Sequence, residues 1–378
     1  MDKKNKNPNV PNLRFSSFAD PFRIYTLKEV LQRISFPVTV DENKLYYQIG
    51  IRSHSKGIFY KEAEIGKQIG NKRIFWIEPN CLILNIVFAW EQAVAKTSEK
   101  EVGMVASHRF PMYKVLNNSL DYIVDFFKTE KGKQLLQMAS PGGAGRNKTL
   151  NQDFFLNSKI YLPSLNEQLK TTELIELIED RIETQIKIID DYNSLKMGIY
   201  NCMFKENYAD YKLKQLAYIV KGDQINNDQL LSNGSYYMMN GGTSPSGYID
   251  SYNVSENTIS ISEGGNSCGY VQFNSCPFWS GGHCYTIQNV NSALIENKYL
   301  YHYLKYKEKE IMNLRIGTGL PNIQKKDLEN FTILVPSLLI QRKNLALFEM
   351  LDEKISILNE ELANLQKQKK YLLCNMFI

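Results

Sequence analysis

Two stretches of the chain place apolar residues at alternating steps of four and three positions. In the later stretch these positions are Leu351, Ile355, Leu358, Leu362, Leu365, Lys369, Leu372 and Met376. The earlier stretch repeats the spacing at Ile178, Ile182, Gln185, Ile189, Tyr192, Lys196, Ile199 and Met203. Such a seam buries a narrow stripe against a partner helix, so it predicts two long helices that pair. The alternative is that each helix lies on its own domain, but the seam is narrower than a typical core-facing stripe.

The two stretches belong to an internal repeat. An offset of 173 residues places Pro163-Ser164-Leu165 over Pro336-Ser337-Leu338 and Met203-Phe204 over Met376-Phe377, without a gap between them. Lys196 then falls on Lys369, and a polar residue in a seam can fix the register of a helix pair. The repeat also extends upstream, because Tyr25–Val30 resembles Tyr211–Leu216. Two equivalent helices can pair antiparallel, which would relate the two copies by a pseudo-twofold axis.

The fold class that these patterns predict is α+β. Short β-like runs separated by Gly, Asn and Ser indicate two β-rich domains in tandem, each followed by a long helix. We expect the first domain at 1–163, its helix at 164–207, the second domain at 208–335 and its helix at 336–378. Further helices are expected at Leu120–Gln137 and Ile295–Met312, and a buried strand at Cys81–Trp90. Residues 1–15 are basic and polar, and we expect them to form a flexible lead-in.

The net charge of +5 is unevenly distributed. Residues 1–163 contain 24 Lys and Arg against 15 Asp and Glu, whereas residues 208–330 contain 10 against 11. A basic first domain is compatible with a polyanionic partner, although a surplus of this size is weak evidence by itself.

Polar loops rich in Gly supply the candidate contacts to such a partner. Their side chains and freed backbone amides can bind bases and phosphates, and Arg109 could fork onto a guanine or a phosphate. The alternative for each loop is an ordinary surface turn, and for His54 or His108 a structural histidine. The candidates in the first domain are Arg52, His54, Lys56, Ser107, His108, Arg109, Arg146, Asn147 and Lys148. Those in the second domain are Thr243, Ser244, Asn266, Ser267, Ser280, His283, Thr318 and Asn322.

The chain lacks the motifs of several enzyme classes. It has no GxxxxGK[ST] loop for ATP, no HExxH, and no Asn/Asp-Pro-Pro-aromatic tetrapeptide or glycine-rich turn for an adenosyl cofactor. Glu263 is a candidate carboxylate, but a turn residue at a strand end is the favoured interpretation. We expect no catalysis, cofactor or metal in this chain. A nuclease site built from scattered acids remains an alternative.

The six cysteines include no CxxC pair, so we expect reduced thiols in a cytoplasmic protein. Cys268, Cys276 and Cys284, with His283 beside the last, leave a zinc site as an alternative to buried thiols, although the usual short ligand spacing is absent. No apolar run reaches the length of a membrane span, and the N-terminus lacks the apolar core of a secretory signal.

The chain resembles the specificity subunits of type I restriction–modification systems over nearly its whole length. The resemblance rests on Leu162–Gln168 and Val335–Gln341, each of which leads into a long helix that ends in Met-Phe. The Tyr-x-Leu starts at Tyr25 and Tyr211 and the segment Gly317–Ile323 also fit. One departure is Ile340, where the family usually has glutamate, as at Glu167.

The resemblance implies two target-recognition domains, each reading one half of a bipartite site in double-stranded DNA. It implies a coiled-coil spacer between them that two methyltransferase subunits bind, with restriction and translocase subunits joining through the complex. Methylation, translocation and cleavage would then reside in the partner chains. The runner-up is a two-domain protein–protein interaction scaffold without DNA specificity, whose mark would be exposed apolar patches instead of basic loops.

Overall fold

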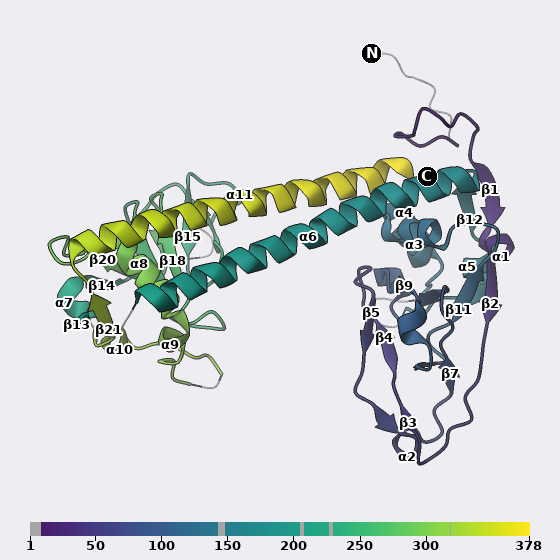
Figure 1. The fold of residues 1–378 in the computed structure, drawn as a ribbon, viewed down its shortest axis with the longest axis horizontal. Helices are drawn as coiled ribbons and strands as arrows, with labels where there is room; N and C mark the ends of the chain where they lie inside the picture. The colour runs from purple at the N-terminus through teal and green to yellow at the C-terminus, as the bar shows by residue number, and fades with distance from the viewer. Residues whose placement is uncertain (1–8, 143–147, 205–207, 227–229, 318) are drawn as a thin grey trace. The chain divides into compact units, whose positions relative to one another are not determined.

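The computed structural model describes residues 9–142, 148–204, 208–226, 230–317 and 319–378. The chain divides into two compact units, of which the first contains residues 1–185 and 361–378 and the second residues 186–360. Each unit therefore contains a globular part and a length of both long helices (Figure 1).

The first unit begins with short strands and helices that alternate along the chain. Its strands are β1 (Arg23–Thr26), β2 (Leu31–Ile34), β3 (Leu45–Tyr46), β4 (Ile49–Ile51), β5 (Ile58–Tyr60), β6 (Glu64–Ile65), β7 (Ile74–Trp76), β8 (Leu82–Leu84), β9 (Val94–Lys96), β10 (Val105–Ser107), β11 (Met112–Val115) and β12 (Lys159–Leu162). Its helices are α1 (Leu27–Val30), α2 (Gly66–Ile69), α3 (Leu120–Lys128), α4 (Glu130–Met138) and α5 (Gln152–Asn157), with 3-10 turns η1 (Ala89–Glu91) and η2 (Glu99–Glu101).

The second unit repeats this organisation with longer strands. Its strands are β13 (Ala209–Lys212), β14 (Tyr218–Lys221), β15 (Tyr236–Met239), β16 (Gly247–Ile249), β17 (Thr258–Ser262), β18 (Val271–Asn274), β19 (Trp279–Ser280), β20 (Cys284–Gln288) and β21 (Thr332–Val335). Its short helices are α7 (Leu213–Leu216), α8 (Asn297–Tyr306), α9 (Glu308–Met312) and α10 (Lys325–Glu329).

Two sheets of the first unit have counterparts in the second. The first unit has a four-stranded sheet in the order β2-β11-β8-β9, and the second has one in the order β14-β20-β17-β18. The first strand of each unit pairs antiparallel with the strand before its long helix: Arg23 faces Leu162 in β1–β12, and Ala209 faces Val335 in β13–β21. The predicted duplication therefore extends to sheet order and register, and the α+β class is confirmed.

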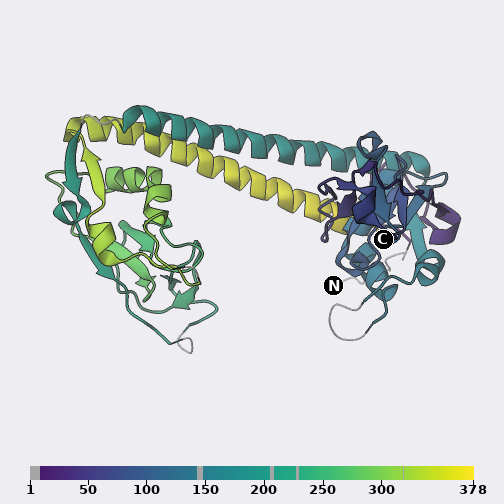
Figure 2. The same ribbon diagram turned by 90° about the horizontal axis from the view of Figure 1, so that it is seen from below.

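Two continuous helices of 39 residues each, α6 (Leu165–Met203) and α11 (Leu338–Met376), follow the two domains. Their side-by-side, antiparallel course is visible within each unit (Figures 1 and 2). In the first unit Glu179 pairs with Lys369 and Gln185 bonds Glu361, so residue numbers rise on one helix as they fall on the other. The seam residues Ile189, Leu351 and Leu358 are buried at 8%, 5% and 4% exposure. The coiled-coil pairing predicted from the seam is confirmed.

The seam lysines form equivalent ion pairs in the two units. Lys369 contacts Glu179 at 2.6 Å in the first unit, and Lys196 contacts Asp352 in the second. The offset of 173 residues relates both the two lysines and the two acids. This reciprocal pattern is the one that a twofold relation between two copies produces, and each lysine is satisfied by a residue from the other helix.

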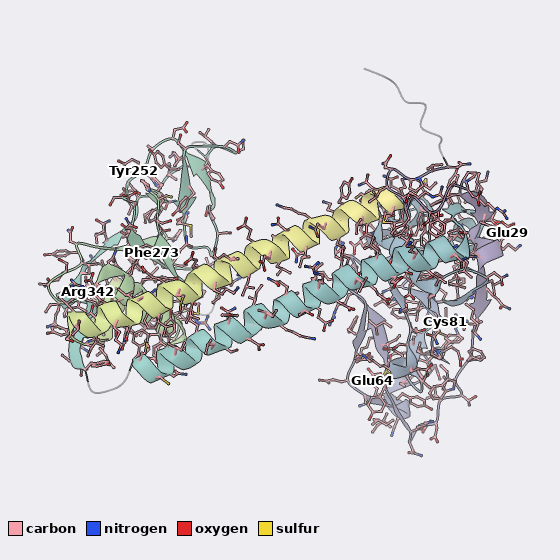
Figure 3. The ribbon with its side chains drawn as sticks, turned by 45° about the horizontal axis from the view of Figure 1, so that its top comes forward. Glu29, Glu64, Cys81, Tyr252, Phe273 and Arg342 are labelled. Carbon is pink, nitrogen blue, oxygen red and sulfur yellow. The ribbon has the colours of Figure 1, made fainter. Side chains whose placement is uncertain are left out.

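A glutamine at the start of each long helix fastens that helix to its own domain. Gln168 accepts from the backbone N–H of Ser119 at 2.9 Å, and Gln341 accepts from that of Glu296 at 2.8 Å. Ser119 and Glu296 are the N-cap residues of α3 and α8, so each glutamine satisfies a backbone donor at a helix start. Arg342, on α11 (labelled in Figure 3), donates to Glu296 at 2.8 Å.

The end of each long helix completes the core of the other copy's domain. Phe377, after α11, lies in the core of the first unit with its ring 4.7 Å from that of Tyr122. Phe204, after α6, lies in the core of the second unit with its ring 5.5 Å from that of Tyr299. The repeated Met-Phe ending is thus a core-packing element.

Three expectations about local structure were wrong. The helix expected over Leu120–Gln137 is divided into α3 and α4 because Thr129 leaves the helical conformation and caps α4 with its hydroxyl, which accepts from the N–H of Gly132. The helix expected over Ile295–Met312 is likewise divided at Lys307. The strand expected over Cys81–Trp90 covers only Leu82–Leu84, since the chain then turns into η1.

Part of the expected flexible lead-in is packed against the first unit. Residues 1–8 lie outside the described chain, but the N–H of Leu13 donates to the carbonyl of Asn375 at 3.0 Å. Arg14 makes a two-point contact with Glu167, each bond being 2.7 Å. Glu167, whose counterpart in the second copy is Ile340, therefore holds this segment against the first unit. Polarity predicted mobility here because the buried partner was not visible in the sequence.

Candidate nucleic-acid interface

The predicted loops of the first unit converge on one segment, Ile86–Gln92. The N–H of Ile86 donates to the carbonyl of Arg109 at 3.0 Å, and the N–H of Leu150 donates to the carbonyl of Ile86 at 2.8 Å. On the other side, His54 donates from its backbone to the carbonyl of Glu91 at 2.6 Å. The structure thereby brings together the loops at 52–57, 107–109 and 148–150, although they are far apart in sequence.

Aromatic rings lie under two of the cations on these loops. The Arg52 guanidinium lies 5.3 Å from the ring centre of Phe59, and the Lys148 ammonium lies 5.0 Å from that of Trp90. Within the described chain, no carboxylate forms an ion pair with Arg52, Lys56 or Arg109, and all three residues are exposed. Exposed cations without acidic partners are suited to bind phosphates.

The backbone of the 52–57 turn adopts an unusual conformation. His54 and Ser55 have φ values of 59° and 54°, in the left-handed region that residues other than glycine rarely adopt. The turn is held in place because the Ser53 hydroxyl donates to the Glu91 carboxylate at 2.8 Å. The neighbouring Arg52 and Lys56 are therefore presented on an anchored turn.

In the second unit the predicted loops converge around Glu263, the residue after β17. The backbone of Glu263 donates to the carbonyl of His283 at 2.9 Å and accepts from the N–H of Ile323 at 2.9 Å. The side chain of Asn240 accepts from the N–H of His283 at 2.9 Å. The N–H of Gly265 donates to the carbonyl of Pro321 at 3.0 Å. Four loops, at 240–246, 263–267, 280–283 and 319–323, therefore form one surface.

The Glu263 carboxylate contacts basic and hydroxyl side chains where these loops meet. One oxygen accepts from the Lys221 ammonium at 2.6 Å and from the Tyr285 hydroxyl at 3.0 Å. Burial, followed by the hydrogen bond to this carboxylate, raises the pKa of Tyr285. The other oxygen is buried, lies 3.7 Å from His283 Nδ1, and has no hydrogen-bond partner among the described residues. This buried carboxylate, paired with Lys221 and Tyr285, holds the surrounding loops together; sequence patterns gave no sign of either partner.

Most other predicted contact residues of the second unit lie on its surface. Thr243, Ser244, Asn266, His283 and Asn322 are exposed, and Ser267 is half-buried. Ser280 is fully buried at 0% exposure, and its N–H donates to Asn253 at 2.7 Å. Its hydroxyl cannot reach a ligand on the surface, because the residue forms part of strand β19 inside the domain.

Three predicted contact residues, Arg146, Asn147 and Thr318, lie outside the described chain. Of the three cysteines weighed as zinc ligands, Cys268 and Cys284 are buried and Cys276 is exposed. The described ranges contain no group of three or more His, Cys, Asp or Glu placed to hold a metal ion. In the same ranges we find no helix with the length and apolarity that crossing a membrane requires.

Parts of the chain are similar in sequence to known proteins. Residues 205–367 match the family model of the type I restriction modification DNA specificity domain. A putative type I specificity subunit of Mycoplasma pneumoniae is 34% identical over 155 residues, 41% of this chain and 41% of that protein. A second, from Mycoplasma genitalium, is 32% identical over 127 residues, 34% of this chain and 33% of that protein. The matches thus span less than half of either relative.

Solved structures share the fold over nearly the whole chain. The crystal structure of a type I restriction–modification S subunit from M. genitalium has a TM-score of 0.65 and 16% identity, covering 98% of this chain and 99% of that one. A chain from a structure that concerns complex assembly and conformational transition of the type I R-M system has a TM-score of 0.60 and 17% identity. The match covers 93% of this chain and 96% of that one. At these identities the likeness concerns the fold.

Proposed function

We propose that this chain acts as a type I restriction–modification specificity subunit, and that its two globular domains each recognise one half of a bipartite sequence in double-stranded DNA. The match of residues 205–367 to the DNA specificity domain and the 34% identity to a putative specificity subunit support this proposal. The observation that carries this proposal is that the same contacts occur within each of the two units. Equivalent lysine–acid pairs and equivalent glutamine anchors join two domains to two helices of equal length. A protein with two equivalent recognition surfaces is suited to a target with two parts.

The recognition domains in this proposal are residues 1–163 and 208–335, and the spacer helices are residues 164–207 and 336–378. In the first domain Arg52, Lys56 and Arg109 would contact phosphates or base edges. In the second, the surface around Glu263 would read bases through Asn266 and His283, because amide and imidazole groups can both donate to and accept from base edges.

The proposal assigns catalysis to partner chains. Two methyltransferase subunits would bind the paired helices, and restriction subunits would join through the complex, in the cytoplasm. This chain would act without a cofactor of its own. Support comes from the contacts of Glu263, the one carboxylate that the sequence offered as a candidate, because the Lys221 ammonium and the Tyr285 hydroxyl both donate to it.

Mapping of genomic methylation in cells with and without this chain tests the function. We expect one bipartite methylated motif that disappears when the chain is deleted and returns when it is restored. Unchanged methylation after deletion would refute the proposal, and capture of partner proteins without any change in methylation would favour the scaffold alternative. Metal-dependent DNA cleavage by the purified chain would favour the nuclease.

The spacer role is tested by lengthening both helices at equivalent points, after Ile189 and after Leu362, by four residues each. Four residues add about 6 Å and about one helical turn, which corresponds to about two base pairs of DNA at 3.4 Å each. The expected motif keeps both half-sequences and gains about two base pairs in its gap. A four-residue insertion after Gly103, in an exposed turn, is the control and should leave the gap unchanged. A change in the recognised bases with an unchanged gap would contradict the spacer role.

A further inference from the structure

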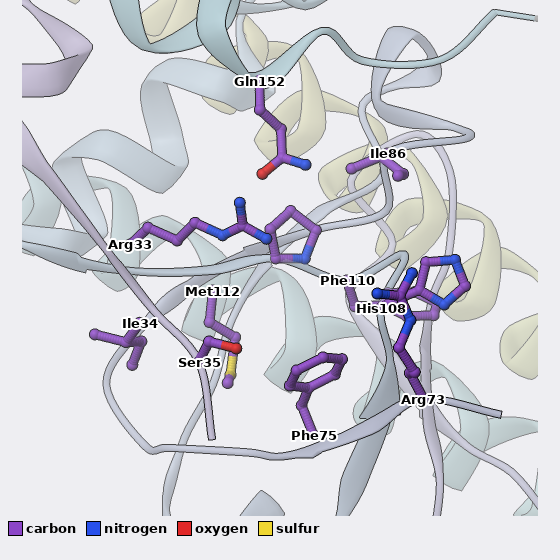
Figure 4. Close-up of a pocket in the computed structure, with 11 residues that line it drawn as sticks. Arg33, Ile34, Ser35, Arg73, Phe75, Ile86, His108, Phe110, Met112 and Gln152 are labelled. Atoms are coloured by element: carbon purple, nitrogen blue, oxygen red, sulfur yellow. The ribbon is translucent and has the colours of Figure 1, made fainter. Parts of the chain in front are cut away.

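A cavity of about 260 Å³ opens in the first unit beside the 107–109 loop (Figure 4). Its frame is built from backbone pairing, because Met112 on β11 faces Ile34 on β2 and the N–H of His108 donates to the carbonyl of Arg73 at 3.2 Å. Gln152, at the start of α5, closes one side. The cavity lies wholly within the first unit and was not indicated by any sequence motif.

The only charged side chains in the lining are those of two arginines. Arg33, Arg73 and His108 reach the cavity from three different segments, and no Asp or Glu lines it. Neither arginine forms an ion pair with a carboxylate of the described chain. Figure 4 shows the Arg73 and His108 side chains next to each other and Arg33 on the opposite side, toward Gln152. Two guanidinium groups without acidic partners favour an anionic occupant, with which arginine forms strong two-point hydrogen bonds.

The remaining lining is apolar and aromatic. Phe75 and Phe110 are half-buried, and Pro111 and Met112 behind them are buried. The Gln152 oxygen already accepts from the Tyr113 hydroxyl at 3.2 Å, so the amide nitrogen is the group that it can offer a ligand. An occupant that satisfies this lining combines an anion, a flat apolar ring and a hydrogen-bonding edge.

The volume limits the size of that occupant. Small-molecule pockets span about 300–1,000 Å³, and this cavity of about 260 Å³ lies just below that range. This volume limits the occupant to about one nucleotide unit, whereas the major groove of a duplex receives whole helices or β-ribbons. The cavity therefore differs in kind from a surface that reads stacked base pairs.

We propose that this cavity binds one nucleoside phosphate unit, with the base against Phe75, the base edge toward Arg33 and Gln152, and the phosphate at Arg73 and His108. Two sources supply this chemistry: a nucleotide turned out of the bound DNA, as proteins that extract bases require, or a free nucleotide. Where the source is DNA, the inference rests on the proposed function and deepens it. It adds a pocket for an unstacked nucleotide to the loops that contact the duplex.

The test uses the full chain and its Arg73→Gln variant, with Arg23→Gln as the matched control, because Arg23 is also exposed but does not line the cavity. Isothermal titration with dAMP, dCMP, dGMP and TMP measures the free-nucleotide arm. We expect saturable binding of at least one nucleotide, weakened ten-fold or more in Arg73→Gln and unchanged in Arg23→Gln. Phe75→Leu should keep phosphate binding but reduce the preference among bases. Circular dichroism of each variant checks that it is folded.

The DNA arm uses duplexes that carry the methylated motif with 2-aminopurine at successive positions. An increase in fluorescence at one position, lost in Arg73→Gln, identifies DNA as the source. Nucleotide binding without such an increase identifies a free nucleotide. The cavity proposal is overturned if neither arm shows a response that Arg73→Gln abolishes. If the duplex still binds with unchanged affinity in that case, the proposed function survives, whereas nucleotide binding by a chain that binds no duplex would refute the function and leave the cavity.

Discussion

Replacing Gln341 with Ala should destabilise the second unit strongly. The Gln341 side chain is 0% exposed and makes three hydrogen bonds. It accepts from the N–H of Glu296 at 2.8 Å and donates to the carbonyls of Leu294 at 2.9 Å and Pro336 at 2.8 Å. Alanine removes all three hydrogen bonds at once. The N-cap of α8, the loop before it and the start of α11 then lack the side chain that joins them.

The magnitude follows from the burial of those groups. A buried donor or acceptor left unsatisfied costs about 1–3 kcal/mol, and the one lost methylene group contributes about 0.8 kcal/mol. With three partners left unsatisfied, we expect the free energy of unfolding of this unit to fall by at least about 3 kcal/mol. With a urea dependence of about 1–3 kcal/mol per molar, the midpoint should shift down by at least about 1 M.

Urea unfolding of the full chain, followed by circular dichroism, measures this shift. Gln168→Ala is the matched variant, since Gln168 also makes three hydrogen bonds in the first unit, to the Ser119 N–H, the Pro163 carbonyl and the Asn118 side chain. It should shift the transition of that unit by a similar amount. Gln366→Ala, at an exposed site on α11, is the control and should change little. Wild-type midpoints for both buried variants would refute the reasoning that these glutamines hold the helices to the domains.

The remaining predictions concern protonation, salt and thiols. Burial lowers the pKa of His302 to about 3, below the value of about 6.5 for an exposed histidine in the unfolded chain. The free energy of unfolding should therefore rise with pH between those two values, by up to about 1.4 kcal/mol per pH unit. In His302→Gln the pH dependence of urea unfolding should be flatter than in the exposed His54→Gln, and equal slopes would exclude a buried neutral imidazole. Replacing Arg52 and Lys56 together with Gln should reduce the slope of log affinity against log salt for the DNA duplex by about 2, and an unchanged slope would remove both from the phosphate contacts. A thiol reagent should modify the three exposed cysteines in the folded chain but reach Cys81, whose pKa burial raises, only on unfolding; fast reaction of Cys81 would contradict its burial.

The helical framework was predictable because its signal is local. A seam such as Ile182–Ile189 fixes which face of a helix is buried wherever the helix lies, and the offset that relates Lys196 to Lys369 identifies the copies before any contact is known. The pairing of each lysine with an acid of the other helix then follows from antiparallel equivalence. The helical breaks at Thr129 and Lys307 were not predictable from apolar spacing, which continues through both positions. At Thr129 a side-chain cap competes with helix continuation, whereas Lys307 makes no side-chain cap.

The recognition surfaces depended on the tertiary structure. Polar, Gly-rich loops indicated which segments could make contacts, but only chain packing brings the turns at 52–57 and 107–109 to Ile86–Gln92, or gathers four loops around Glu263. The same packing buries Ser280, which its sequence neighbours place in a polar loop. Arg33 and Arg73 belong to no motif, because their common cavity arises from strand pairing between distant segments. Periodicity records which face of an element is buried, whereas the meeting of distant residues depends on how the whole chain folds; the sequence alone therefore determined the helices and the duplication, and the tertiary structure decided the sites.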